Sequence, residues 1–396
     1  MAPADEAGAP PPDGGGAQAA QDPNTTRGDS FPCAQCGAQL RFTPGQKRLS
    51  CQYCGHAQDI PYTDEDRALA LQTHDVHEAL AEKLPDSAIE ETRILPCQNC
   101  GAQVQFDPRE HARECAFCGT PVVADSGTHR HVKPAALLPF KLTEAEAHDA
   151  MRSWIKGLWL APNGLKHYAR SDRKLDGLYV PYWCFDADTV SDYTGQRGTH
   201  YYVTTTDSKG RTRRSRRTRW TPASGRVSRD FRDMLVLATE SLPRQQSRGL
   251  GPWPLGQLSP YDPQFLAGFR AAGYDVGLRD GHRIGHERMD DQIRRDVRAH
   301  IGGDAQRITS VTTRHGNERF KHVLLPIWMA AYRYRDKSYR FIVNGQTGKV
   351  QGERPWSRWK VAGVILLGVI LAGLIVWVGG IDALLIILDI LASMDF

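Results

Sequence analysis

The sequence lacks the common motifs that carry catalysis. It has no G-x-S-x-G nucleophile elbow and no glycine-rich dinucleotide fingerprint. Residues 343–350 resemble a phosphate-binding loop, but Val stands at 343 and 350, where a Walker A motif needs Gly and then Ser or Thr. The stretch that begins at His286 lacks the second histidine of the metalloprotease pattern. These absences argue against an ATPase motor, a dehydrogenase and a metalloprotease, and we predict that the protein is not an enzyme.

The sequence also lacks a secretion signal. Its first 30 residues have neither a basic start nor an apolar run, and they are rich in Ala, Pro, Gly and Gln. Such a segment cannot bury enough apolar surface to offset the entropy lost on ordering. We therefore expect residues 1–30 to be a disordered tail. Without export, the cysteines are expected to stay reduced.

The cysteines that are present occur almost entirely in a repeated pattern. Eight of the nine form two copies of C-x2-C-x14-C-x2-C, and each cysteine of the second copy lies 64 positions after its counterpart. This spacing is typical of four-cysteine zinc sites, in which two tight turns aim four sulfurs at one ion. The predicted ligands are Cys33, Cys36, Cys51 and Cys54 in the first copy and Cys97, Cys100, Cys115 and Cys118 in the second.

Four thiolate ligands leave no open position on the metal, so we predict two structural Zn²⁺ ions. Iron in a rubredoxin-like site uses the same four sulfurs, and the choice between zinc and iron stays open. Disulfide bonds are a third interpretation, which the missing secretion signal disfavours. The ninth cysteine, Cys184, follows a tryptophan in an apolar segment and is expected to be a small buried side chain rather than a nucleophile.

The hydrophobic pattern predicts a multidomain protein. Apolar residues at helical spacing after Thr63 indicate a helical spacer between two tandem zinc ribbons. Strand-like and helix-like runs alternate after residue 140, with helices expected at 262–272 and 286–300, which predicts a mixed α/β (α+β) domain. The predicted order is zinc ribbon 31–61, helical spacer 62–94, zinc ribbon 95–125, linker 126–139 and mixed α/β domain 140–355.

Arginines crowd one predicted hairpin, residues 201–220. A strand with one buried face carries charge only at every second position. Here arginine occurs at both odd and even positions, so we expect the hairpin to project from the core with both faces in water. Anionic lipid head groups and nucleic-acid phosphates would both attract these arginines, and an arm that only aids solubility is the third interpretation. The arginines are Arg211, Arg213, Arg214, Arg216, Arg217 and Arg219.

The longest apolar run lies near the C-terminus. Residues 361–378 form an uncharged stretch that would be about 27 Å long as a helix, close to the roughly 30 Å of a hydrocarbon core. Residues 361–380 are therefore predicted to be a transmembrane helix. Arg354, Arg358 and Lys360 precede it, which places the N-terminal bulk in the cytoplasm. The apolar tail at 381–396 is too short to span and is expected to lie in the interface or form half of a hairpin.

These motifs, in this order, resemble a group of bacterial membrane proteins. They are the two ribbons, V-P-Y-W at 180–183, the segment 324–328, V-N-G-Q-T-G-K-V-Q-G-E at 343–353 and the anchor. The group is described as having zinc ribbons of the transcription-factor-IIB type, and many members carry the automatic name "primosomal protein N′ (replication factor Y), superfamily II helicase". The resemblance implies a bacterial cytoplasmic (inner) membrane location and an association with membrane-stress proteins. It implies no helicase activity here, because the chain has no Walker A lysine.

From the sequence we predict a membrane-anchored zinc-ribbon scaffold. Its ribbons would recruit a protein partner to the cytoplasmic face of the membrane, in membrane stress or remodelling. The alternative is a membrane-tethered nucleic-acid-binding protein, related to replication or transcription but without a helicase motor, that uses the ribbons and the arginine-rich hairpin. A small-molecule substrate is not expected, because the sequence shows no catalytic constellation.

Overall fold

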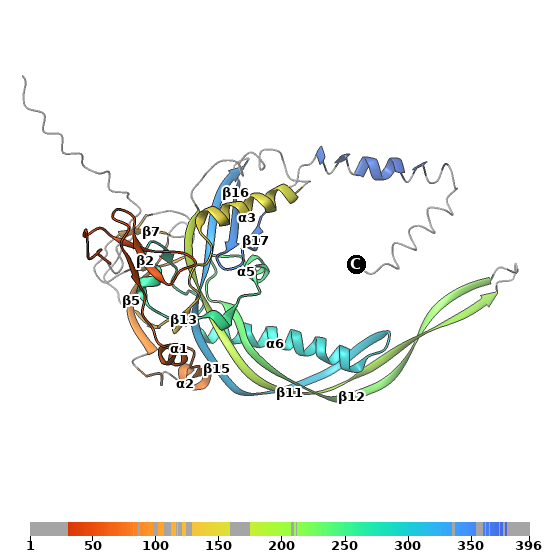
Figure 1. Cartoon of the computed structure of the whole chain (residues 1–396). Helices are drawn as coiled ribbons and strands as arrows, with labels where there is room; N and C mark the ends of the chain where they lie inside the picture. The colour runs from red at the N-terminus through yellow and green to blue at the C-terminus, as the bar shows by residue number, and fades with distance from the viewer. Residues whose placement is uncertain are drawn as a thin grey trace, which may run out of the picture.

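The computed structural model is described for residues 31–353 and for helical residues between 359 and 377 (Figure 1). Positions inside these ranges that are not described are 82, 86–87, 98–101, 107–111, 116, 118–120, 124–128, 159–174, 207–209, 211, 335–336, 361, 364, 372 and 375–376. The tail predicted at 1–30 and the apolar tail predicted at 381–396 lie outside the described residues.

Three long antiparallel strands form the centre of the molecule. Strand β11 (Asp176–Thr206) lies between β12 (Thr212–Leu237) and β15 (Ala305–Tyr334) and pairs with both (Figure 1). Burial along β11 changes in steps: residues 178–185 are buried without a break, residues 186–195 are buried at alternate positions, and residues 199–206 are mostly exposed. The same strand therefore runs from a core covered on both faces to an arm covered on neither.

One long helix, α6 (Leu278–Ile301), lies along the inside of the curve that these strands make (Figure 1). Its apolar side chains recur at helical spacing and are buried against the sheet; they include Ile284, Met289, Ile293, Val297 and Ile301. Two glycines allow the helix backbone to approach the sheet closely. A Cβ atom on Gly281 would lie 2.5 Å from Trp183, and one on Gly285 would lie 3.2 Å from Phe185.

The remaining strands of the main sheet are short. They are β4 (His74–Asp75), β10 (Ala136–Leu137), β13 (Ser259–Pro260), β14 (Arg270–Ala271), β16 (Lys337–Asn344) and β17 (Val350–Gly352). Short helices flank them: α1 (Asp64–Ala70), α2 (Val76–Leu80), α3 (Glu144–Gly157) and α5 (Arg244–Leu250), with 3-10 turns at Leu255–Gln257 and Pro263–Leu266. Helix α3 begins with a capping box, in which Thr143 and Glu146 bond each other's backbone N–H groups.

The cysteine-rich segments form small sheets of their own. Strands β1 (Leu40–Phe42), β2 (Arg48–Cys51) and β3 (Ala57–Asp59) make the first. Strands β5 (Ile89–Pro96), β6 (Gln103–Phe106) and β9 (His129–Val132) make the second, and β7 (Ala112–Glu114) pairs with β8 (Pro121–Val123). Phe42 of β1 packs edge-on against Phe265 with ring centroids 5.4 Å apart, so the first cysteine segment is attached to the main body.

The mixed α/β fold predicted for residues 140–355 is wrong, because this region is mostly β-sheet with few helices. The helix expected at 286–300 lies within α6, but 262–272 forms only a 3-10 turn and β14. Gly268, at φ 88°, turns the chain where a helix would have to continue. The segment 62–94 also differs from a single helical spacer, since β4 interrupts it between α1 and α2 and pairs with β15.

The transmembrane helix predicted at 361–380 is not supported. No helix in the described part of the chain has the length and apolar character needed to cross a membrane. The same finding overturns two further predictions: that the protein is integral to a membrane, and that it lies in the bacterial inner membrane.

Replacing Gly281 by Ala should lower the free energy of unfolding by about 1 kcal/mol. A methyl group there collides with the buried Trp183 ring, and overpacking of about 1–3 kcal/mol outweighs the helix propensity of roughly 1 kcal/mol that Ala adds. Gly157→Ala, where the new methyl meets nothing within 4 Å, is the control and should be neutral or slightly stabilising. Urea unfolding of both variants measures the difference, and equal stability of Gly281→Ala and the wild type would contradict this packing.

Candidate functional site

The first four predicted cysteines come together beside the β1–β3 sheet. The sulfurs of Cys33 and Cys54 are 3.6 Å apart, and those of Cys36 and Cys51 are 3.5 Å apart. All four sulfurs lie within 4.8 Å of one another. These separations are too long for a disulfide, whose sulfurs lie about 2.05 Å apart, so the group consists of four free thiols.

Two equivalent turns build this group. Gly37 donates a backbone hydrogen bond to the Cys33 carbonyl at 2.8 Å, and Gly55 donates one to the Cys51 carbonyl at 3.1 Å. Both glycines have positive φ angles, 73° and 75°, a conformation that a residue with a Cβ rarely adopts. Each C-x2-C-G segment is therefore a tight turn with both sulfurs on one side, as the spacing predicted.

The four-cysteine group can hold a metal ion. A tetrahedral ion with bonds of about 2.3 Å to sulfur holds its ligands about 3.8 Å apart, close to the sulfur separations here. Backbone hydrogen bonds from Cys54 and Tyr53 lower the pKa of Cys51 to about 6. A backbone hydrogen bond from Ala38 favours the Cys36 thiolate, but bonds with the neighbouring thiols outweigh it and raise the pKa of Cys36 to about 12. Without a cation the group thus holds protons that a metal would displace.

The second predicted group is described only in part. Cys97 and Cys115 are buried, whereas Cys100 and Cys118 lie outside the described residues. The backbone N–H of Cys97 donates to the Ala102 carbonyl at 2.8 Å, and in the first group Cys33 donates to Ala38 at 2.7 Å. The hydrogen bond made by the first cysteine of each copy, to the residue five positions later, is therefore repeated along with the sequence.

The predicted arginine-rich hairpin is the far end of β11 and β12, which extends away from the rest of the molecule (Figure 1). Pairing of β11 with β15 ends at Gly198, so residues 199–206 and 212–220, here called the basic arm, are a two-stranded ribbon. Arg211 lies outside the described residues. The other five arginines are exposed; they are Arg213, Arg214, Arg216, Arg217 and Arg219.

Arginine and tyrosine occur on both faces of the basic arm. Alternation along the strands puts Arg217 on the face of Tyr201, and Arg216 on the opposite face with Tyr202. The guanidinium of Arg214 lies 4.1 Å from the centroid of the Tyr202 ring, and that of Arg219 lies 5.5 Å from that of Tyr201. Within the described chain, none of the five exposed arginines forms an ion pair, so their charges remain available to a ligand.

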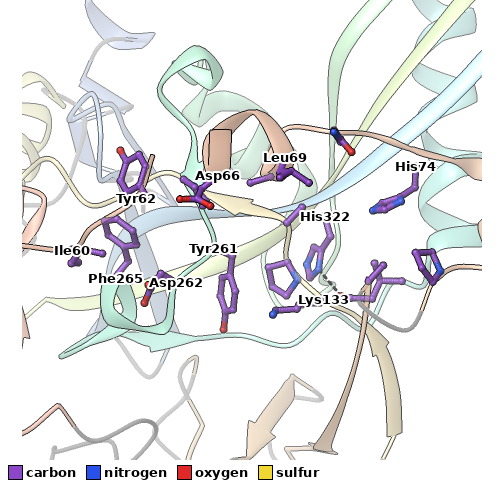
Figure 2. Close-up of a pocket in the computed structure, with 18 of the residues that line it drawn as sticks. Ile60, Tyr62, Asp66, Leu69, His74, Lys133, Tyr261, Asp262, Phe265 and His322 are labelled. Carbon is purple, nitrogen blue, oxygen red and sulfur yellow. Dashed lines mark hydrogen bonds between the residues drawn. The ribbon is translucent and has the colours of Figure 1, made fainter. Parts of the chain in front are cut away.

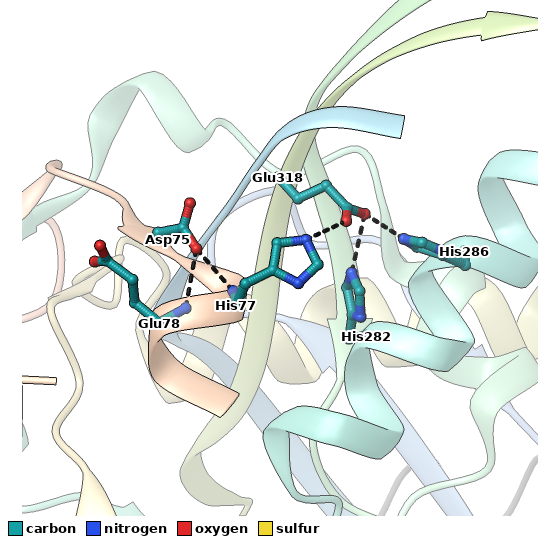
Figure 3. Close-up of polar contacts among 6 residues, drawn as sticks. All are labelled: Asp75, His77, Glu78, His282, His286 and Glu318. Atoms are coloured by element: carbon teal, nitrogen blue, oxygen red, sulfur yellow. Dashed lines mark hydrogen bonds and ion pairs between the residues drawn. The ribbon is translucent and has the colours of Figure 1, made fainter. Parts of the chain in front are cut away.

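A cluster that we did not predict surrounds Glu318 of β15 (Figure 3). His77 of α2 and His282 of α6 place their Nε2 atoms 3.0 Å from its two carboxylate oxygens, and the Nε2 atom of His286 also contacts the oxygen that His282 contacts. Glu318 is nearly buried, with 8% of its side chain exposed. His315 stacks on His286 with ring centroids 4.1 Å apart.

Three features of the backbone bring this cluster together. A β-bulge sets Asn317 and Glu318 opposite the single residue Ala187, and Asn317 has a positive φ of 49°, so the bulge redirects the Glu318 side chain. Strand β4 pairs with β15 beside it. Asp75 then caps α2 by accepting hydrogen bonds from the backbone N–H groups of His77 and Glu78 at 2.8 and 3.0 Å (Figure 3).

The charges in the cluster follow from burial and hydrogen bonding. Burial favours the neutral carboxyl of Glu318, but hydrogen bonds from His286 and His282 outweigh it and lower the pKa of Glu318. Burial, together with the nearby His286, lowers the pKa of His282. Burial lowers the pKa of His315 in the same way. The arrangement therefore favours the carboxylate form of Glu318 and the neutral forms of His282 and His315.

Only part of this cluster had a signal in the sequence. His282 and His286 lie four residues apart, the spacing that puts two imidazoles on one face of a helix, and this pair could have been found. Their partners could not, because Glu318 is 32 residues after His286 and His77 is 241 residues before Glu318.

An open pocket of about 590 Å³ lies between the chain that follows the first cysteine group and the edge of the main sheet (Figure 2). Tyr62, Tyr261 and Phe265 supply aromatic walls, and four prolines and Leu69 add apolar surface. Leu69 is 64% exposed at this pocket. Asp66, Asp262, Lys133 and His74 line it as well, so the pocket combines apolar walls with charged and polar groups.

Comparison with known proteins identifies one distant relative. Over 348 residues, 84% of this chain and 92% of the relative, the chain is 28% identical to a Bacillus subtilis (strain 168) protein named "Uncharacterized protein YdjG". That name mentions neither a helicase nor a primosomal protein, and the predicted resemblance remains a prediction. The chain matches no protein-family model and no solved structure.

Cys33→Ser combined with Cys36→Ser should remove about one metal ion per chain, because each pair supplies half of the ligands of the first group. The ribbon should also lose its fold, since structural zinc contributes of order 10 kcal/mol in small zinc domains. Elemental analysis and limited proteolysis of the purified full chain measure both effects. Cys184→Ser is the control, because Cys184 is buried in the main sheet. Unchanged metal content in the double variant would contradict the site.

Proposed function

We propose that the protein binds nucleic acid through the basic arm. The observation that carries the proposal is a projecting two-stranded ribbon with exposed arginines on both faces. Arginine neutralises phosphate and releases counterions, and exposed tyrosines provide rings on which bases stack. This is the alternative function that the sequence suggested, without a membrane tether.

The two-sided charge favours a nucleic acid over a flat acidic surface. A flat surface can contact only one face of the ribbon and leaves Arg216 or Arg217 turned away. The major groove of B-DNA is about 12 Å wide, admits a two-stranded β-ribbon and has phosphates along both sides. Eight residues of β11 beyond Gly198 extend about 27 Å, long enough to follow such a groove.

Affinity for duplex DNA should depend steeply on salt. Five phosphate contacts give a slope of about −4.5 in log K against log salt, or roughly 500-fold weaker binding at 200 mM than at 50 mM salt. Replacing Arg213, Arg214, Arg216, Arg217 and Arg219 by Gln should abolish that dependence, measured by fluorescence anisotropy with a labelled duplex.

The control removes the same charge elsewhere. Helix α6 also has exposed arginines, and the control variant has Gln at Arg279, Arg283, Arg294, Arg295 and Arg298. It should retain the wild-type salt slope, because these residues lie outside the basic arm. An equal loss in both variants, or no duplex binding by the wild type at 50 mM salt, would show that the basic arm is not a nucleic-acid site.

For the metal we propose zinc, held structurally in both cysteine groups. Four sulfur donors complete a tetrahedron and leave no position for a substrate. The support is the geometry of the first group and the matching hydrogen bond from Cys97 to Ala102. Iron binds the same ligands, and its visible absorption in the purified protein would identify it instead.

A protein-recruiting scaffold is the second candidate, and the aromatic pocket favours it. A photo-crosslinking residue at Leu69 should capture one discrete partner in cells, because Leu69 is exposed at this pocket. The same residue at Glu287, exposed on α6, should not capture that partner. Identical crosslinked species from both positions would count against a specific docking site.

A further inference from the structure

The histidine cluster around Glu318 differs from an ordinary surface ion pair. One carboxylate, 8% exposed, faces the Nε2 atoms of three imidazoles that come from two different helices. Two of these nitrogens converge on the same oxygen, Oε1. Burying a carboxylate is costly unless a cation or several hydrogen bonds compensate for the lost water.

We propose that His282, His286 and Glu318 bind a divalent transition-metal ion of the zinc class. Their Nε2 and Oε1 atoms all lie within 4.8 Å of one another. Zinc bonds of 2.0–2.1 Å in a tetrahedron place neighbouring ligand atoms about 3.3 Å apart, and the Nε2 of His282 is already 3.0 Å from Oε1. Small side-chain adjustments therefore suffice to admit the ion.

The ligand set selects the class of ion. Two imidazoles and one carboxylate suit zinc, nickel, copper and iron. Magnesium and calcium prefer sites made only of oxygen donors, and the softer thiolate ligands of the cysteine groups are absent here. The pair on α6 is four residues apart, so both imidazoles leave the same face of the helix. Three protein ligands leave one position for water, unlike the cysteine groups.

His77 has a different role from the three ligands. Its Nε2 lies 3.0 Å from Oε2, the second oxygen of Glu318, so it can orient the carboxylate while Oε1 binds the ion. His315, stacked on His286, fixes the plane of that ring. Through His77 the site also connects α2, in the segment between the two cysteine groups, to α6 and the main sheet.

The first test compares the metal content of full-length variants equilibrated with Zn²⁺ and then desalted. Glu318→Gln and His286→Asn should each contain about one zinc fewer per chain than the wild type. His77→Asn should keep the stoichiometry at saturation but bind roughly 10–100-fold more weakly, as expected for a group that orients a ligand. Competition with a chromogenic chelator measures that affinity.

A matched control separates this site from general loss of histidine. His148→Asn removes a histidine 4.0 Å from Glu144 on α3, outside the cluster. It should keep the wild-type zinc content. Full zinc content in Glu318→Gln and His286→Asn would overturn the proposal.

A second test uses the wild-type chain and needs no substitution. Protein whose cysteine groups are filled with zinc is titrated with Co²⁺. Binding of about one Co²⁺ with ligand-field absorption but no thiolate charge-transfer band is expected, because the new site has only nitrogen and oxygen donors. No bound Co²⁺, or a cobalt spectrum dominated by thiolate, would overturn the proposal even if the variants fail to fold. Neither outcome depends on whether the basic arm binds DNA.

Discussion

The pairing of β11 along both of its edges is the constraint on which the rest of this structure depends. Strand β11 bonds β12 from Tyr182 to Thr206 and β15 from Asp176 to Gly198, so one continuous strand fixes the positions of two others. Sheets twist and bend, and three strands of this length cannot stay flat. The neighbouring strands bend at β-bulges opposite β11, one at Asp233 in β12 and one at Asn317 in β15. Both of these residues have positive φ angles. The bent sheet forms the concave face that α6 covers.

The same arrangement produces the two candidate sites in the main sheet. Beyond Ala305, the first residue of β15, β11 and β12 continue without a third strand, and the basic arm begins. Where β15 bulges, Glu318 turns toward α6 and meets His282 and His286. A ribbon with no covering layer has no apolar face to bury, so arginines can occupy both of its sides. A bulge under a helix, in contrast, brings a charged group into a partly buried place, where imidazoles or a metal ion must compensate for its charge.

The cysteine groups depend on a different kind of interaction. In the first group, each turn is closed by a hydrogen bond between residues four positions apart, such as Gly37 to Cys33, and by a glycine with a positive φ angle. The first group is therefore built locally and then attached to the main body through Phe42 and Phe265. A metal ion at such a site stabilises a segment too small to have a large core of its own. The histidine cluster, in contrast, requires the main sheet and α6 to be folded first.

The sequence by itself determined the features that depend on neighbouring residues. The C-x2-C-G spacing predicted the grouping of the first four cysteines. Arginine at both odd and even positions of the strand predicted a hairpin with both faces exposed to solvent. Local pattern failed where long-range pairing decided the outcome: β4 joined β15 in place of a continuous spacer helix, and the region after residue 140 became mostly sheet. An apolar run predicted a transmembrane helix that the described residues do not support. Only the tertiary structure could bring His77 to Glu318, because the two residues are 241 positions apart and no local pattern indicates the contact until strand pairing brings their elements together.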